Sequence, residues 1–236
     1  LESEFNTPAP WLDQASLILG KSYEGISGLI WKIKSAWGSN HSLTRVPRIR
    51  PLDPHSAWHR FLSLFREQGI LRGFQPKEGE VLEISWEKPR EAYNYFAHCG
   101  WLEHLIYFTL KGMADEAYLN LKVYRMKEAN RSVLAEYDVV ARMGATLFFF
   151  ECKAGSTVLD GSQLPQAIQS FQAKVKLSAG VMARPALVLS NRFKSPSDLL
   201  VERAQHTGVR IITYEEIRDN LKETLEAVLR PFPQKT

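Results

Sequence analysis

Three charged residues near the middle of the chain have the types and the spacing that phosphodiester hydrolysis requires. Asp138 lies in an apolar run, and Glu151 and Lys153 follow directly after the run 147–150. Two carboxylates repel each other unless a cation lies between them, and Mg²⁺ or Mn²⁺ binds such oxygens together with water and phosphate. The ammonium of Lys153 can position an attacking water or stabilise the charge of the transition state. These residues therefore indicate metal-assisted hydrolysis with Mg²⁺ or Mn²⁺.

A predicted hairpin turn brings these residues together. Residues 143–145 form a short connection with a glycine between two β-rich runs, which is typical of a hairpin. If the turn is centred there, Asp138 lies opposite Glu151, and Glu136 lies opposite Lys153. Side chains alternate along a strand, so Glu136 and Asp138 share one face of the sheet. Directly opposed Cβ atoms lie about 4.5–5.5 Å apart, which is close enough for a shared cation.

A structural ion pair is the alternative interpretation. Glu-x-Lys is a common sequence, and on an edge strand Glu151 and Lys153 would simply point to solvent. The three phenylalanines before Glu151 and the apolar neighbours of Asp138 instead predict buried strands. Opposite charges beside a core need a specific reason. Spacing alone favours neither the nuclease nor the structural ion pair.

Three longer motifs resemble those of a known nuclease family. They are Cys99-Gly100-Trp101-Leu102-Glu103, Ala135-Glu136-Tyr137-Asp138-Val139 and Glu151-Cys152-Lys153. In this order and spacing they are similar to the PD-(D/E)xK nuclease domain of CRISPR-associated effectors, which carry a CARF sensor domain and are activated by cyclic oligoadenylate. The resemblance covers residues 55–230. Ala135 departs from the family pattern, which has asparagine at this position.

The resemblance implies a complete metal site. Glu103 would join Asp138 and Glu151 as a metal ligand, with the main-chain carbonyl of Cys152 as a further ligand and Lys153 as the catalytic cation. A carboxylate in the first turn of a helix is also favoured by the helix dipole. A purely structural role for Glu103 is therefore the alternative.

Two accessory residues are weaker candidates. Glu136 is kept as in the family, and Gln163 lies near the start of the helix that follows Lys153, a helix that lends a polar residue to the site in related nucleases. A solvated helix face is the alternative for Gln163. The apolar face of the same helix consists of Leu164, Ile168, Phe171 and Val175, and Gln166 and Gln169 point away from it.

The patterns of apolar residues predict the elements that position these side chains. Helices are expected at 57–68, 91–98, 101–111, 165–177, 196–206 and 215–229, and strands at 80–86, 117–125, 133–142, 146–153, 186–190 and 209–213. Glycines divide residues 11–38 into two short helices, and prolines predict an exposed linker at 38–54. The fold class is α/β, a restriction-endonuclease-like PD-(D/E)xK core whose mixed central sheet is flanked by helices. We expect a helical extension and linker at 1–54 and the nuclease domain at 55–236.

Composition excludes several other classes of protein. The 236 residues are 44% apolar and 24% charged, as in an ordinary globular protein. No apolar run approaches the roughly 18 residues that span a bilayer, so no membrane partner is expected. Cys99 and Cys152 are too few for a zinc cluster and fit two reduced thiols in a cytoplasmic protein. The net charge of +4 is only a weak indication of a polyanionic partner.

The leading hypothesis is a metal-dependent endonuclease that cuts single-stranded or nicks double-stranded DNA and/or RNA. The resemblance implies a homodimer that serves CRISPR-linked antiviral defence. Residues 1–54 hold no room for a sensor domain, so either the sensor domain is missing from this sequence or the nuclease is regulated in another way. The N-terminal helices could be an inter-domain connector, a dimerisation element or a docking surface for a second protein. The alternatives are a non-cleaving nucleic-acid-binding or scaffolding module on a nuclease fold, and a transposition or restriction nuclease.

Overall fold

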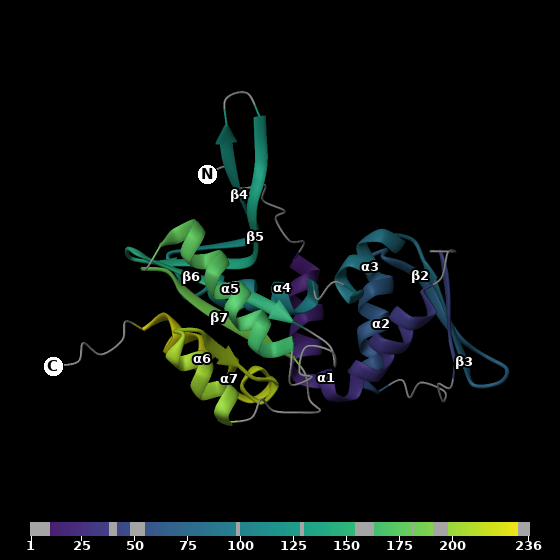
Figure 1. Ribbon diagram of the computed structural model, residues 1–236. Coiled ribbons are helices and arrows are strands. Elements are labelled where there is room, and N and C mark those ends of the chain that lie inside the picture. The colour runs from purple at the N-terminus through teal and green to yellow at the C-terminus, as the bar shows by residue number, and fades with distance from the viewer. Residues whose placement is uncertain are drawn as a thin grey trace. The chain divides into compact units, whose positions relative to one another are not determined.

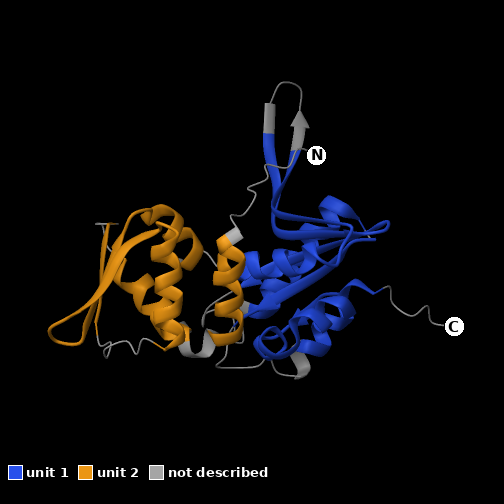
Figure 2. Cartoon of the chain, turned by 180° about the vertical axis from the view of Figure 1, so that it is seen from behind, with its two compact units in different colours: residues 1–8, 102–236 blue, residues 9–101 orange. Residues whose placement is uncertain are grey.

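The computed structural model describes residues 10–37, 42–47, 55–97, 100–127, 130–153, 163–180, 182–190 and 198–230. The chain forms two compact units, residues 9–101 and residues 102–236 together with 1–8 (Figure 2). This division lies between residues 101 and 102, whereas the sequence motifs place a boundary at residue 55. None of the helices in the described ranges has both the length and the apolar composition that crossing a bilayer demands.

The first unit along the chain combines helices with a small antiparallel sheet. Its elements are α1 (Pro10–Ala36), β1 (Leu43–Val46), α2 (Ala57–Glu67), β2 (Leu71–Lys77), β3 (Val81–Trp86) and α3 (Pro89–Ala97). The strand order is β1-β3-β2. Aromatic side chains of α2, β3 and α3 stack in its core, with Phe65 and Phe96 rings 5.3 Å apart.

Two expectations for this unit are wrong. Residues 10–36 form one helix rather than two, because Ala15, Leu19, Ile26, Leu29 and Ile33 make a fully buried stripe that outweighs the helix-breaking glycines. The expected linker at 38–54 contains β1, which pairs with β3. Strand β2 was not predicted, because Gly73 and Pro76 interrupt its sequence and its exposed end shows no apolar alternation.

The second unit is built on a five-stranded mixed sheet. Its elements are α4 (Gly100–Lys111), which begins two residues before the division, β4 (Glu116–Lys127), β5 (Asn130–Met143), β6 (Thr146–Lys153), α5 (Gln163–Ala179), β7 (Arg184–Leu189), α6 (Asp198–His206), β8 (Arg210–Ile212) and α7 (Tyr214–Leu229). The strand order is β4-β5-β6-β7-β8. The pairs β4–β5 and β5–β6 are antiparallel, and the pairs β6–β7 and β7–β8 are parallel. The predicted mixed sheet flanked by helices is confirmed.

Helix α5 packs on one face of this sheet (Figure 1). Its predicted apolar face is confirmed, because Leu164, Ile168, Phe171 and Val175 are all buried against strand residues that include Tyr137, Phe149 and Leu187. The sheet also buries alternate side chains on its opposite face, where Phe148 and Phe150 are at most 1% exposed. Burial on both faces keeps β6 rigid, and β6 carries Glu151 and Lys153 at its end.

The hairpin between β5 and β6 has the predicted register. The paired residues run from Met143–Thr146 to Val139–Phe150. Gly144 makes the turn with a positive φ of 59°, a conformation that glycine adopts without strain. Asp138 and Glu151 come directly after the last pair of this ladder.

The pairing of β5 with β4 is also interrupted beside Asp138. The pairing with β4 passes from Leu119–Val139 to Leu121–Tyr137 and skips Asn120 and Asp138. Asn120 has a φ of 53°, which is unusual within a strand and is tolerated best by glycine and asparagine. Asp138 therefore lies where the regular pairing of β5 is interrupted on both sides, and beyond this level β4 and β5 continue as a two-stranded ribbon (Figure 1).

Candidate active site

Asp138 lies against the strand that carries Glu151. Its Oδ2 accepts a hydrogen bond of 2.6 Å from the main-chain N–H of Cys152. This bond takes the place of a ladder bond beyond Val139–Phe150, and it holds the carboxylate between the two strands. Burial and then the charge of Glu151 raise the pKa of Asp138 to about 6, although the Cys152 N–H and the two nearby lysines lower it.

Glu151 is held by two ammonium groups. The Nζ atom of Lys153 donates to Oε1 and the Nζ atom of Lys174 donates to Oε2, both at 2.6 Å. The side chain of Glu151 is only 15% exposed. Burial on its own would raise the pKa of Glu151, but the hydrogen bonds from Lys153 and Lys174 outweigh it, and the pKa lies below its usual value. Glu151 is therefore ionised near neutral pH.

Helix α4 contributes Glu103 from its first turn. Burial, followed by the charge of Asp138, raises the pKa of Glu103 to about 8, and Lys153 opposes this shift. Gly100, the glycine of the first motif, lies where the main chain at the start of α4 packs closely against α3. A Cβ atom on Gly100 would lie 3.1 Å from the carbonyl oxygen of Asn94 and 3.3 Å from the Cα of Tyr95, so a larger residue here would press on the main chain of α3.

The donor set suits a hard divalent cation, although its side chains alone do not enclose one. No three His, Cys, Asp or Glu side chains among the described residues come together closely enough to hold a metal ion. Mg²⁺ sites commonly use one or two carboxylates and complete the shell with main-chain oxygens, water and phosphate. Glu103 and Asp138 are destabilised in their charged forms by burial and mutual repulsion, and a cation would relieve this. A carboxylate has about four lone-pair sites, so Glu151 can accept both lysines and still bind a cation.

The remaining predicted site residues are placed as follows. The side chain of Cys152 is 3% exposed and points to the sheet face opposite Glu151 and Lys153, so only its main-chain atoms are near the site. Glu136 is exposed, and its main-chain oxygen accepts a hydrogen bond of 2.9 Å from Lys174. Gln163 begins α5, but its side chain lies outside the described residues, so its role stays a prediction.

Lys174 is a site residue that the sequence reasoning missed. Its ammonium group contacts Glu151, the main chain of Glu136 and, at 4.8 Å, the ring of Tyr137. The signal was present in the sequence, because Lys174 lies between Phe171 and Val175 at the edge of the apolar face of α5. A lysine at that edge extends its amine along the sheet surface.

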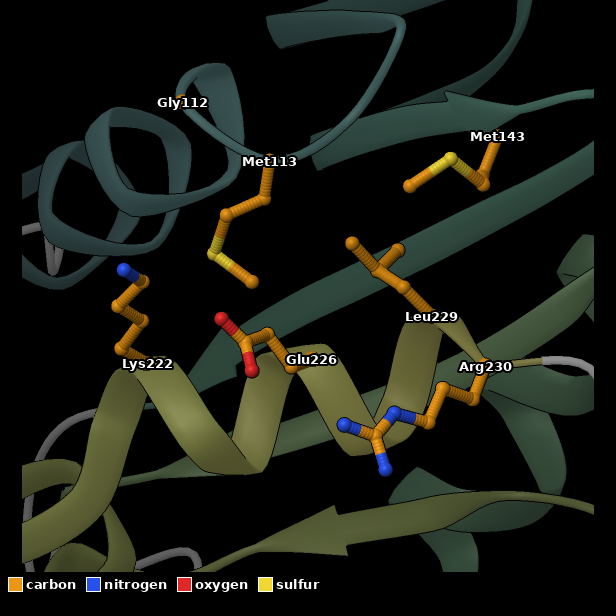
Figure 3. Close-up of a pocket in the computed structure, with 7 residues that line it drawn as sticks. All are labelled: Gly112, Met113, Met143, Lys222, Glu226, Leu229 and Arg230. Carbon is orange, nitrogen blue, oxygen red and sulfur yellow. The ribbon is translucent and has the colours of Figure 1, made fainter.

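Of two cavities lined by described residues of this unit, one includes site residues. A cavity of about 230 Å³ is lined by Glu151, Lys153, Ala167, Ser170, Phe171, Lys174 and Leu187. A larger cavity of about 500 Å³ is lined by residues that follow α4, by Met143 at the other end of β5 and by side chains of α7, as Figure 3 shows. Glu226 is the single carboxylate among its described lining residues, so the smaller cavity is the better candidate for hydrolysis.

The mixed sheet and its helices place the chain in the restriction-endonuclease-like class, with Asp138 of β5 beside the Glu-x-Lys sequence that ends β6. The model of the Card1-like endonuclease domain family matches residues 90–230, and the chain belongs to this family. The match confirms the resemblance to the nuclease domains of CRISPR-associated effectors that the sequence motifs indicate.

Solved structures share the fold over nearly the whole chain. Protein VC1899 from Vibrio cholerae has a TM-score of 0.65 and 24% identity, and the match covers 96% of this chain and 58% of that one. Can2 from Sulfobacillus thermosulfidooxidans, solved with cyclic tetra-adenylate, has a TM-score of 0.60 and 12% identity and covers 94% of this chain and 57% of that one. This chain thus spans less than two thirds of either protein. No curated protein sequence is significantly similar to it.

Proposed function

We propose that this endonuclease domain hydrolyses phosphodiester bonds of DNA and/or RNA with Mg²⁺ or Mn²⁺. The observation that carries this proposal is the meeting of Asp138, within β5, with Glu151 and Lys153 at the end of the neighbouring strand β6. Glu103, Asp138, Glu151 and the main-chain carbonyl of Cys152 would hold the cation. When bound, the cation would supply Lewis acidity and lower the pKa of a coordinated water.

The residues of the chain would share the remaining work. Lys153 would place a positive charge beside the phosphate, where negative charge accumulates in the transition state. Lys153 is already oriented by its hydrogen bond to Glu151, so little reorganisation is needed when the substrate binds. Asp138 is fixed by the N–H of Cys152 and would keep one carboxylate oxygen in place.

The biological setting is part of the same proposal. Membership of the Card1-like endonuclease family and the shared fold with Can2, which was solved with cyclic tetra-adenylate, support a role in CRISPR-linked antiviral defence. We propose that the protein works as a cytoplasmic homodimer. A cyclic oligoadenylate, bound by a sensor domain or a second protein that acts on the N-terminal helices, would control its activity.

The decisive experiment compares cleavage with and without metal. Labelled single-stranded DNA, duplex DNA and RNA are incubated with Mn²⁺ or with EDTA, and products are separated on a gel. We expect cleavage with Mn²⁺ and none with EDTA. The cleavage rate should fall about 10²-fold or more in Asp138→Ala, Glu151→Ala and Lys153→Ala. Glu223→Ala removes an exposed carboxylate of α7 and should cleave normally. Circular dichroism checks that each variant is folded.

Two results would reject the proposal. Wild-type activity in all three site variants would rule out this site. Binding of nucleic acid without cleavage in every metal would instead favour the non-cleaving module, and the nuclease core would then serve as a scaffold.

A further inference from the structure

Lys174 makes contacts that a surface lysine does not need. Its Nζ atom donates to Oε2 of Glu151 at 2.6 Å and to the main-chain oxygen of Glu136 at 2.9 Å. It also lies over the rings of Tyr137 and Phe171, at 4.8 and 5.4 Å from their centres. The side chain is 28% exposed, so its amine is fixed by β5 and β6 while one side still reaches solvent.

The base of Lys174 is fixed as well. Its main-chain oxygen accepts hydrogen bonds from the hydroxyl of Tyr137 at 2.9 Å and from the hydroxyl of Ser178 at 3.1 Å. Helix α5 is thereby attached to β5 at this residue. Because the main chain of Lys174 is fixed, its side chain can carry the ammonium group only to partners close to this point of α5.

The charges of the inner site balance without a metal. Asp138 and Glu151 supply two negative charges, and Lys153 and Lys174 supply two positive charges. A divalent cation bound to the carboxylates adds two positive charges. Ionisation of Glu103 on binding offsets one of them, so an excess positive charge remains that a nearby anion would balance. Glu151 would then no longer need two ammonium partners.

The cavity beside Glu151 offers Lys174 another partner. Lys174 and Ser170 are one turn apart on α5, and both line it together with Lys153. Two ammonium groups and a hydroxyl are typical ligands of a phosphodiester group. A nucleic-acid phosphate in this cavity would lie within reach of Lys174.

We propose that Lys174 changes partner when a divalent cation binds: it neutralises Glu151 in the metal-free site and contacts a backbone phosphate of the nucleic acid in the metal-bound site. This inference rests on the proposed function, because it needs a metal at Glu151 and a nucleic-acid substrate. It makes Lys174 a link between metal binding and substrate binding. Lys153 would remain the cation at the reacting phosphate.

The first test measures Mn²⁺ affinity without nucleic acid, by isothermal titration calorimetry. In Lys174→Met the metal no longer competes with an ammonium for Glu151, so we expect affinity to rise about fivefold. Lys174→Arg keeps the charge and should bind Mn²⁺ like the wild type. Lys176→Met removes an exposed lysine of the same helix and is the matched control. An unchanged or weaker Mn²⁺ affinity in Lys174→Met would overturn the inference.

The second test measures the salt dependence of binding to a single-stranded oligonucleotide, by fluorescence anisotropy. Ca²⁺ takes the same oxygen ligands as Mg²⁺ and is compared with EDTA, with a gel to verify that the strand is intact. In Ca²⁺ the slope of log K against log salt should be smaller by about 0.7 in Lys174→Met than in the wild type, and in EDTA the two slopes should agree. If the slopes of the two proteins differ equally in Ca²⁺ and in EDTA, Lys174 contacts phosphate independently of the metal. If the slopes agree in both conditions, Lys174 makes no phosphate contact. Both outcomes overturn the inference.

Titration of the wild-type protein with Mn²⁺ distinguishes failure of the proposed function from failure of the inference about Lys174. If wild-type protein binds no Mn²⁺ and does not cleave, the proposed function fails and the inference fails with it. If wild-type protein binds Mn²⁺ and cleaves, but Lys174→Met matches it in metal affinity and in both salt slopes, only the inference fails.

Discussion

At the scale of single residues, Glu151 shows which parts of a site a sequence can reveal. Lys153 is two residues away on the same strand, so the Glu-x-Lys spacing predicts their contact. Lys174 comes from the next helix and reaches the same carboxylate only through the packing of α5 on the sheet. Local spacing carries no information about that packing. The edge position of Lys174 beside Phe171 was the available signal.

Glu103 gives a prediction for pH. Its pKa in the folded, metal-free protein is about 8, against a usual value of 4.5, mainly because of burial. The folded state therefore holds this proton more tightly than the unfolded chain does. The stability present below about pH 4.5 is lost as the pH rises towards 8.

The variant Glu103→Gln tests this account. Since Gln carries no charge, it should be more stable than the wild type at pH 8 in EDTA, by up to about 4 kcal/mol, and about equal at pH 4. Urea unfolding at both pH values measures the difference. Equal stability at pH 8 would mean that Glu103 is well solvated.

At the scale of elements, the core strands and helices of the second unit were predictable and the details at Asp138 were not. Long apolar alternation and the short turn at Gly144 predicted β5, β6 and their register. The irregularity at Asn120 has no sequence signal, because asparagine is common in many backbone conformations. In the first unit, β1 and β2 were missed, since short strands with Gly or Pro depend on tertiary pairing.

Asn120 supports a prediction about the strand opposite Asp138. A β-branched residue is strained at a φ of 53°, so Asn120→Val should cost about 1–2 kcal/mol of the free energy of unfolding. Asn120→Gly suits the same backbone and should stay within about 0.5 kcal/mol of the wild type. Urea denaturation compares the three proteins. Equal losses in both variants would point to the asparagine side chain rather than to the backbone.

The attachment of α5 to β5 gives a second prediction at this scale. Tyr137→Phe removes the hydroxyl that donates to the main-chain oxygen of Lys174, so we expect a loss of about 1 kcal/mol. Tyr118→Phe removes a hydroxyl bonded to the exposed Glu116 and should cost less than about 0.5 kcal/mol. Thermal unfolding ranks the two. A Tyr137→Phe protein as stable as the wild type would show that packing alone holds α5.

At the scale of the whole molecule, the chain has two compact units, and only residues 102–230 carry the proposed site. A cation that binds the folded site and not the unfolded chain stabilises that unit. Mn²⁺ at 100 times its Kd should add about 2.7 kcal/mol and raise the Tm by roughly 5–10 °C. Differential scanning calorimetry measures this shift, and EDTA should reverse it. The Asp138→Ala protein should show little shift, and a full shift there would place the cation elsewhere.

The composition of the whole chain argues against tight nonspecific binding. With 30 basic and 26 acidic residues, the net charge is only +4, so the long-range attraction of the whole chain for a polyanion is weak. If the proposed function holds, a few placed cations such as Lys153 and Lys174 would contribute more to nucleic-acid binding than the overall charge does.

The thiol of Cys152 is a natural reporter in the strand that carries the site. It is 3% exposed and faces the core side of β6, so a thiol-reactive dye can label it only when that strand separates from its neighbours. In a protein whose other cysteine is replaced by serine, the labelling rate would time the opening of β6. Slower labelling in the presence of a cation would show that the cation makes the opening of β6 rarer, and the measurement needs neither substrate nor gel.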